Sequence, residues 1–401
     1  MSTAEQLIVG SMIVLPFTLL RFGIMGLGEV FFILLFIYTL IRPIVADWLS
    51  SFHFSRFWVA YLLVSFIGFL YNVIFLDHAT GTVEGMVFDC GAFMMVLMAC
   101  FSLENLIKRG KINTYAILRN IFFTSSIVMV ALYVASLFTD SILGLSLKYH
   151  HYFVPLANNL HQISMFLVPL PFIGLKIFAI EKKRWIKLLV VFLILMDAYM
   201  AFSTGSTKAY LSIFLGIFSF LILHIYLTFS KELRIVLFML VVILSGTGII
   251  IFIGGIKDYL IEYFTTNDLG GGRQMLYNEA INIAKKSPIF GLGTGAHIWT
   301  EDKFSDAHQS FLAAFLHAGL IGVVLLVNLF YKLLRRNFND PALFAAIIAI
   351  LLYALGGDIL RRLPIWVFMV LLFYYNKRDE YYFKQSNKIR LLAALKALSS
   401  K

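Results

Sequence analysis

Apolar runs long enough to cross a lipid bilayer recur from one end of this sequence to the other. They constrain its fold more than any other feature, because a membrane-spanning helix needs about 20 mainly apolar residues. Of the 401 residues, 60% are hydrophobic and only 14% are charged, whereas soluble domains are about half apolar and a quarter charged. The sequence therefore predicts an all-α polytopic membrane protein.

We expect a single transmembrane domain over residues 1–401, with about twelve helical spans. The first apolar run lacks a positively charged leader and a small-residue cleavage pattern, so we interpret it as a span and not as a signal peptide. The expected spans are 7–25, 28–45, 57–75, 86–104, 117–138, 156–180, 187–203, 209–229, 235–255, 309–330, 342–358 and 363–376.

Basic residues are distributed unequally between the two sets of loops. Lys and Arg gather in residues 108–111, 181–187, 230–234, 331–336 and the tail at 376–401. Basic loops face the cytoplasm. We therefore expect a multi-pass membrane protein with a cytoplasmic basic tail and both termini in the cytoplasm. In a bacterial inner membrane, the one long loop, residues 256–308 between spans nine and ten, would face the periplasm. The net charge of +11 follows the same rule and does not indicate nucleic acid.

Several polar residues stand inside the expected spans, where they are costly and often functional. Most of them fall near the predicted outer boundary, which favours an enzyme over a transporter with polar residues at the midplane. For Asp89, Asp197 and His161 both a structural hydrogen bond and a functional role are open, whereas His224 and His317 fit a structural role. The full set is Asp89, Asn158, Asn159, His161, Asp197, His224 and His317.

His308 opens the tenth expected span, and Gly319 follows it by eleven positions. Eleven steps of about 100° return to within about 20° of the starting direction, so both residues lie on one helix face. A glycine there permits close approach of a neighbouring helix. We expect this packing to hold His308 at the outer boundary, while His317 points to the opposite side.

The long loop contains three consecutive glycines, residues 270–272, followed by Arg273. Consecutive glycines can turn their backbone N–H groups toward an anion, and an arginine adds a forked set of donors. A helical segment is expected next, with one apolar side made by Leu276, Ala280, Ile283 and Ala284. The spaced glycines after it, at 291, 293 and 295, lack the strand–turn–helix context of a dinucleotide site.

Three elements follow one another in this part of the chain. They are Arg273, a Pro-x-x-Gly-x-Gly turn at residues 288–293, and His308 with Gly319 entering the next span. In this order and topology they resemble the O-antigen ligase and Wzy-type polysaccharide polymerase family. Two details depart from the family pattern. Thr207 and Lys208 replace a Ser-Arg pair, and a leucine follows Arg273 at the third position instead of the fourth.

The resemblance implies a GT-C-like fold and a metal-independent, cofactor-free glycosyl transfer with inversion. The donor would be an undecaprenyl-diphosphate-linked glycan, whose leaving group needs positive charge. By the resemblance, His308 acts as base or orienting partner for the acceptor hydroxyl, and Arg273 stabilises the diphosphate. Further substrate contacts are expected from Lys208, Arg361, Arg362, His161, Asp358 and Gly271.

Three functions remain open at this point. The first is an O-antigen ligase that joins the glycan to lipid A–core. The second is a polymerase that extends O-antigen or capsular repeat units on their own carrier. A flippase or transporter, the third, would leave His308 dispensable for chemistry. The expected partners are the lipid-linked donor, a lipid A–core or growing-glycan acceptor, and membrane lipid.

Overall fold

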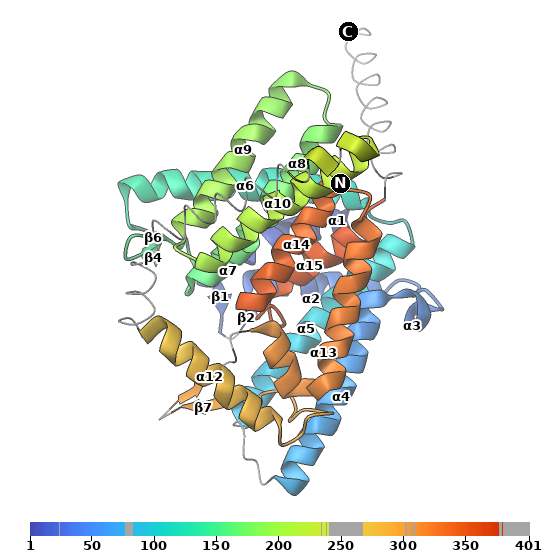
Figure 1. Ribbon diagram of the computed structural model, residues 1–401, viewed down its shortest axis with the longest axis vertical. Coiled ribbons are helices and arrows are strands. Elements are labelled where there is room, and N and C mark those ends of the chain that lie inside the picture. Colours follow the sequence, from blue (N-terminus) through green and yellow to red (C-terminus); the bar gives the residue numbers. More distant parts are fainter. Residues whose placement is uncertain are drawn as a thin grey trace.

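The computed structural model describes residues 1–23, 25–76, 83–233, 235–237, 239, 268–300, 303–305, 307, 309–376 and 379. Within these ranges, only the backbone is described for residues 83–85, 268–275, 299–300 and 303–305. Helices dominate the ribbon, and the few strands form short hairpins at the ends of helices (Figure 1). His308, the ninth expected span and the tail beyond residue 379 lie outside the described residues, apart from a few positions of that span.

The described helices follow the expected order along the chain. They are α1 Thr3–Val14, α2 Leu27–Leu40, α3 Trp48–Ser51, α4 His53–Phe75, α5 Val83–Lys108, α6 Thr114–Phe138, α7 Leu160–Leu167, α8 Leu170–Ile180, α9 Arg184–Ser203, α10 Thr207–Thr228, α12 Asp268–Ala284, α13 Ser310–Asn337, α14 Pro341–Gly356 and α15 Leu363–Phe373.

The four sheets in the described part of the chain are two-stranded antiparallel hairpins. They pair β1 Arg21–Phe22 with β2 Met25–Gly26, β3 Ser141–Ile142 with β4 Leu145–Ser146, β5 Lys148–Tyr149 with β6 Tyr152–Phe153, and β7 Ile298–Thr300 with β8 Lys303–Ser305.

In the described part of the chain, seven helical segments are long and apolar enough to cross a membrane. They are α4, α5, α6, the nearly continuous α7–α8 pair, α9, α10 and α13. Four shorter apolar helices, α1, α2, α14 and α15, accompany them. Each of these elements corresponds to an expected span, and the all-α polytopic membrane fold is confirmed. Many large apolar side chains on α4, α6, α9 and α10 face outward, as suits a surface surrounded by lipid.

The first expected span, residues 7–25, is wrong in its extent. Helix α1 ends at Val14, and the chain then turns into the β1–β2 hairpin around Gly23. Pro16 lacks a backbone donor and cannot continue the helix. The hairpin returns the chain so that Gly28 of α2 packs against Leu15, and the Ser11 hydroxyl donates to the Gly28 carbonyl at 2.8 Å.

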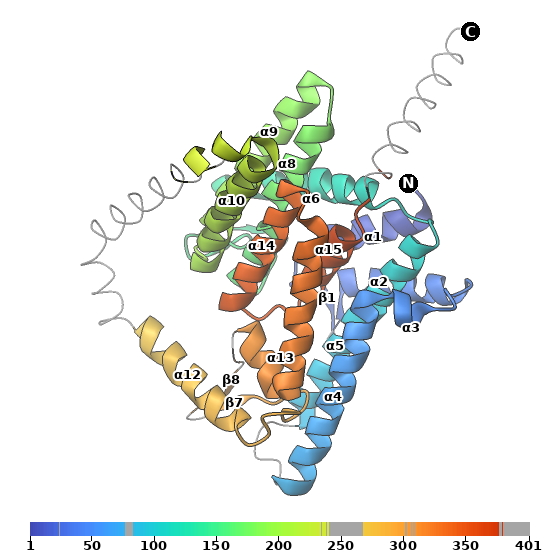
Figure 2. The ribbon, with the colours of Figure 1, turned by 45° about the vertical axis from the view of Figure 1, so that its right-hand side comes forward.

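Helix α15 lies at the centre of the bundle, in contact with α5, α13 and α14 (Figures 1 and 2). Every residue from Ile365 to Leu372 is at most 1% exposed. The helix is short, and the Trp366 indole anchors its start by donating to the carbonyls of Ile359 and Leu360 at 3.0 and 3.1 Å. The turn that precedes α15 is therefore held rigidly at one end of the bundle.

We call the end of the bundle that contains this turn, the β1–β2 hairpin and the start of α10 the site end. There α12 lies across the bundle and packs on α13 and β7 (Figure 2). Ala280, Ile283 and Ala284 are buried, and Leu276 packs against the core, which agrees with the apolar side expected for this helix. The described part of the 256–308 loop thus folds back onto the bundle.

Helix α13 is broken at Gly319, whose φ of 60° and ψ of −158° are not helical. The 288–293 turn fits into this break: Leu292 N–H donates to Leu316 O at 2.7 Å, Gly293 N–H to His317 O at 3.0 Å, and Leu320 N–H to Pro288 O at 2.8 Å. These bonds satisfy backbone groups that the kink frees from the helix.

The expected relation between His308 and Gly319 on one helix face involves His308, which lies outside the described residues, so it stays a prediction. Helix α13 starts only at Ser310, and the kink interrupts the regular 100° steps on which that relation depends. A Cβ at Gly319 would clash with the carbonyl of Ile289 and lie 2.6 Å from Gly291 N. The glycine does permit a close approach, but the neighbour is the 288–293 turn and not another helix.

Candidate functional site

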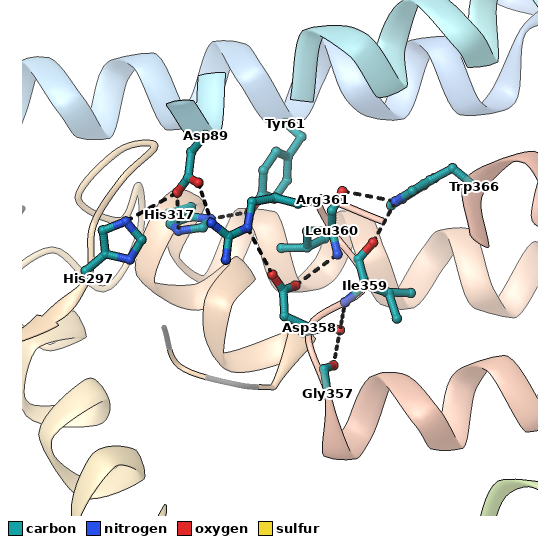
Figure 3. Close-up of polar contacts among 11 residues, drawn as sticks. Tyr61, Asp89, His297, His317, Gly357, Asp358, Ile359, Leu360, Arg361 and Trp366 are labelled. Atoms are coloured by element: carbon teal, nitrogen blue, oxygen red, sulfur yellow. Dashed lines mark hydrogen bonds and ion pairs between the residues drawn. The ribbon is translucent and has the colours of Figure 1, made fainter. Parts of the chain in front are cut away.

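Asp89 of α5 is the centre of a buried polar cluster near the site end (Figure 3). Its side chain is 0% exposed. One oxygen, Oδ1, accepts from Arg361 Nη1 at 2.8 Å. A carboxylate at this depth requires a partner, because an unpaired charge is costly in a membrane. Arg361 provides that partner from the turn before α15.

The second oxygen of Asp89 faces two imidazoles. His297 Nε2 lies 3.6 Å from Oδ2, and His317 Nε2 lies 4.0 Å away. Among the described residues, Oδ2 accepts no hydrogen bond. The other ring nitrogen of His317 is 3.3 Å from the Tyr61 hydroxyl of α4. The cluster therefore joins α4, α5, α13 and the segment after the 288–293 turn, and it places two imidazoles beside one buried carboxylate.

Two carboxylates hold Arg361 in place. Besides Asp89, Asp358 Oδ2 lies 3.5 Å from Arg361 Nε, and Asp358 also accepts from the Leu360 backbone at 2.9 Å. This turn is tied to the start of α13: the Ser310 hydroxyl donates to Gly357 O at 2.7 Å and accepts from Ile359 N–H at 2.9 Å. The guanidinium is thus fixed in direction, with much of its charge balanced from the buried side.

A small cavity of about 10 Å³ lies beside the cluster. His297, His317, Asp358 and Arg361 line it, together with Ala307 and other apolar residues. That volume is about the minimum that holds one water molecule, and the polar partners such a water needs are present. A hydroxyl group of similar size would meet two imidazoles and a guanidinium there.

A larger cavity of about 300 Å³ lies on the other side of Arg361. We call it the arginine pocket, because Arg21, Arg361 and Arg362 all line it. Glu29 also contributes, but its carboxylate caps α2 by accepting from Gly26 N–H at 2.8 Å. Arg361 is already paired with Asp89 and Asp358. The positive character that suits an anionic group therefore comes mainly from Arg21 and Arg362, against the one carboxylate of Glu29 in the lining.

Lys208 and His161 lie on the α10 side of the same turn. A Cβ at Gly356 would be 3.2 Å from Lys208 Cγ, and one at Gly357 would be 3.5 Å from Lys208 Nζ. His161 Nδ1 is 3.4 Å from the Ser206 hydroxyl, and its carbonyl accepts from Tyr353 at 3.0 Å. The structure therefore brings Lys208, His161, Asp358, Arg361 and Arg362 to one end of the bundle.

Other predicted site residues are described only in part. Gly271 and Arg273 lie within α12, which starts at Asp268, and their side-chain surroundings are outside the description. The glycines expected to form an anion-binding loop are helical, so their N–H groups point along a helix axis. For His308 only the neighbours are described: Ala307 lines the small cavity, and Gln309 caps α13 by accepting from Leu312 N–H.

Sequence reasoning did not assign His297 or Arg21 to the site, left Asp89 undecided, and gave His317 a structural role. The chain offers a signal for Asp89, a carboxylate in an apolar span. Arg21 lies in β1, inside the run expected to be the first span, and His297 lies just before β7; the sequence analysis singled out neither residue. Among the described residues, no group of three or more His, Cys, Asp or Glu is arranged to hold a metal ion.

Comparison with known families gives one finding. Residues 177–327 match a family model described as O-Antigen ligase. The matched segment runs from α8 into α13 and includes Lys208, His297 and His317, whereas Asp89 and Arg361 lie outside it. The comparison with curated proteins found no match.

Proposed function

We propose that this chain, whose residues 177–327 match a family model described as O-Antigen ligase, is an O-antigen ligase of a bacterial inner membrane. In this proposal the enzyme transfers a glycan from undecaprenyl diphosphate to lipid A–core at the periplasmic face. It needs no metal ion, and the anomeric configuration is inverted. Lipopolysaccharide would be the product.

The arginine pocket is the observation that carries the proposal. Glycosyl transfer from a lipid diphosphate breaks the bond between the anomeric carbon and a phosphate oxygen, which leaves negative charge on the diphosphate. Donors fixed in advance around that charge stabilise the transition state. Arg361 is held by Asp89 and Asp358, and Arg21 and Arg362 line the same cavity, so the pocket has such donors.

We assign binding and activation of the acceptor hydroxyl to His308 and the neighbouring buried cluster around Asp89. In the proposed step the acceptor oxygen bonds to the anomeric carbon, and its proton passes to the imidazole of His308. Ala307 on one side of His308 lines the small cavity, and Ser310 on the other is bonded to the turn that carries Arg361. Both flanking contacts support a role for His308 in this part of the molecule.

The test uses the purified protein in lipid nanodiscs, a lipid-linked glycan donor and lipid A–core. Arg362→Gln is expected to lower kcat about a hundredfold, a magnitude typical for the loss of one charge-stabilising donor. His308→Ala should abolish transfer with protein abundance retained. The matched control is Arg335→Gln, because Arg335 is an exposed arginine in the last turn of α13, at the opposite end of the bundle.

The acceptor decides between the two transferases. Product that appears only when lipid A–core is supplied supports the ligase. Longer glycan on the carrier lipid, formed without lipid A–core, would instead identify the protein as a polymerase. Normal transfer by both Arg362→Gln and His308→Ala would remove the proposed site.

A further inference from the structure

A second cavity at the site end has a different chemical character. It has a volume of about 380 Å³ and lies between the ends of α6 and α9, the start of α10 and the β5–β6 hairpin. Four tyrosines line it, Tyr133, Tyr152, Tyr199 and Tyr210, and we call it the tyrosine pocket. Small-molecule pockets start at about 300 Å³, so it has room for about one or two sugar rings.

The tyrosines present both ring faces and hydroxyls. Tyr199 is 51% exposed and Tyr210 is 41% exposed. The rings of Tyr133 and Tyr199 are nearly perpendicular at 5.5 Å, and the Tyr133 hydroxyl donates to that of Tyr199 at 3.0 Å. The hydroxyl of Tyr199 can still donate, because a phenol both gives and accepts hydrogen bonds.

This combination matches the surface of a sugar. A pyranose ring has a face of C–H groups and a rim of hydroxyls. The negative face of an aromatic ring attracts the C–H groups, while tyrosine and serine hydroxyls suit the rim. Ser136 and Ser203 supply further hydroxyls in the lining.

The charge balance favours a neutral ligand. Lys148 is the one lysine or arginine among the residues described as lining the pocket, and its ammonium is paired with Asp140 at 2.9 Å. A diphosphate or an anionic lipid headgroup would have to compete with Asp140 for this single cation. The arginine pocket, lined by three arginines, has the opposite character.

A short turn connects the tyrosine pocket to the rest of the site. Ser203 ends α9 and Tyr210 lies in the first turns of α10. Between them the ring of Tyr152 packs directly against Gly205, whose φ is +73°. Lys208 follows on the same turn and lies against Gly356 and Gly357, beside the turn that leads to the arginine pocket. The same connection therefore borders both binding regions.

We propose that the tyrosine pocket binds a sugar unit of the lipid-linked glycan, by stacking on Tyr199 and hydrogen bonding to the surrounding hydroxyls. This inference rests on the proposed transferase function. It gives the enzyme a glycan subsite apart from the diphosphate, where binding sets affinity for the sugar chain.

An aromatic belt at a membrane surface is the simplest alternative, because Tyr is common where helices meet lipid headgroups. Such a belt gives each exposed tyrosine a similar role. Tyr149 offers the comparison: it is 60% exposed on the neighbouring strand β5 and is not part of the pocket lining.

The experiment measures binding by saturation-transfer NMR with the full-length protein in nanodiscs. The probe is the oligosaccharide released by mild acid from the lipid-linked glycan of the producing cells, and glycerol 3-phosphate serves as a headgroup probe. Tyr199→Leu is expected to raise the Kd for the oligosaccharide about fivefold to tenfold, the scale of a lost aromatic contact. Tyr199→Phe keeps the ring and should retain most of the affinity, and Tyr149→Leu should leave the Kd unchanged.

Each outcome decides the proposal. Equal Kd values for Tyr199→Leu and the unaltered protein would overturn it, as would an equal loss in Tyr149→Leu. Binding of glycerol 3-phosphate in place of the oligosaccharide would identify a headgroup site and also overturn it. The oligosaccharide should still bind to His308→Ala. If it binds and no variant or condition gives transfer, the sugar site stands and the proposed function fails.

Discussion

Helix α5 carries two buried carboxylates that have opposite surroundings. Asp89 and Glu104 are both 0% exposed and lie about 22 Å apart along the helix. Glu104 accepts from the backbone N–H groups of Phe54 and Ser55 at 3.0 and 2.8 Å, from the Ser55 hydroxyl at 2.6 Å, and from the Tyr374 hydroxyl at 2.8 Å. Asp89 accepts one hydrogen bond, from Arg361, and has two imidazoles nearby.

The difference separates a structural carboxylate from a functional one. Glu104 caps the start of α4, where N–H groups lack partners within the helix, and both of its carboxylate oxygens accept hydrogen bonds. Asp89 keeps one oxygen without a hydrogen bond in the described part of the chain, beside the imidazoles of His297 and His317. Unsatisfied buried polar groups are rare and often mark working sites. The comparison predicts that changes at Glu104 affect folding and changes at Asp89 affect chemistry.

Glu104→Gln should have the largest effect on stability. The amide replaces one acceptor oxygen with a donor, which faces other donors in a buried place. We expect the free energy of unfolding to fall by about 3 kcal/mol, measured by denaturant unfolding in detergent micelles. Transfer activity per folded molecule should stay unchanged, and a fall in that activity at normal stability would contradict the structural role.

Asp89→Asn is the matched change at the other carboxylate. It keeps the shape and removes the charge that orients Arg361 and faces the two histidines. Transfer per folded molecule should drop at least about tenfold, equivalent to roughly 1.4 kcal/mol in the barrier. Stability should fall less than in Glu104→Gln, because Asp358 still holds Arg361. If the Asp89→Asn protein were unfolded, or folded and fully active, the proposed contrast between a structural Glu104 and a functional Asp89 would be wrong.

Tyr374→Phe removes a single donor from Glu104. One net hydrogen bond of this kind is worth about 1 kcal/mol, and that loss should appear in the free energy of unfolding. Turnover should not change. The double variant Tyr374→Phe with Glu104→Gln should lose less free energy of unfolding than the sum of the two single losses. Such a difference would show that both residues act through one contact.

Tyr61→Phe is the smallest change and the counterpart of the previous one. It removes the hydroxyl 3.3 Å from His317 and leaves the packing of the ring intact. We expect about a twofold to threefold fall in transfer, on the scale of a weak hydrogen bond, with a shift in the pH profile and little effect on unfolding. If Tyr61→Phe lowered the free energy of unfolding as much as Tyr374→Phe does, the surroundings of Asp89 and Glu104 would not differ in role.

Much of the fold could be predicted because hydropathy is a local property. The described long helices fall within a few residues of the expected spans, and the apolar side of α12 is where its sequence pattern placed it. The extent of the first span was predicted wrongly because the run from residue 7 to residue 20 is mainly apolar. Only the reversal at Pro16 and Gly23, fixed by packing of Gly28 on Leu15, shows that the helix has ended.

The sequence by itself determined the membrane class, the order of the helices and the gathering of costly polar residues at one end. Each of these depends on residue type summed along a short stretch of chain. Tertiary structure decided which polar residues meet. Asp89 pairs with Arg361 from 272 positions away. His317, which a regular helix would have turned from the site, is in the cluster, and the 288–293 turn fits a break at Gly319. Charge pairing and kinks depend on which helices become neighbours, and only the packed bundle settles that.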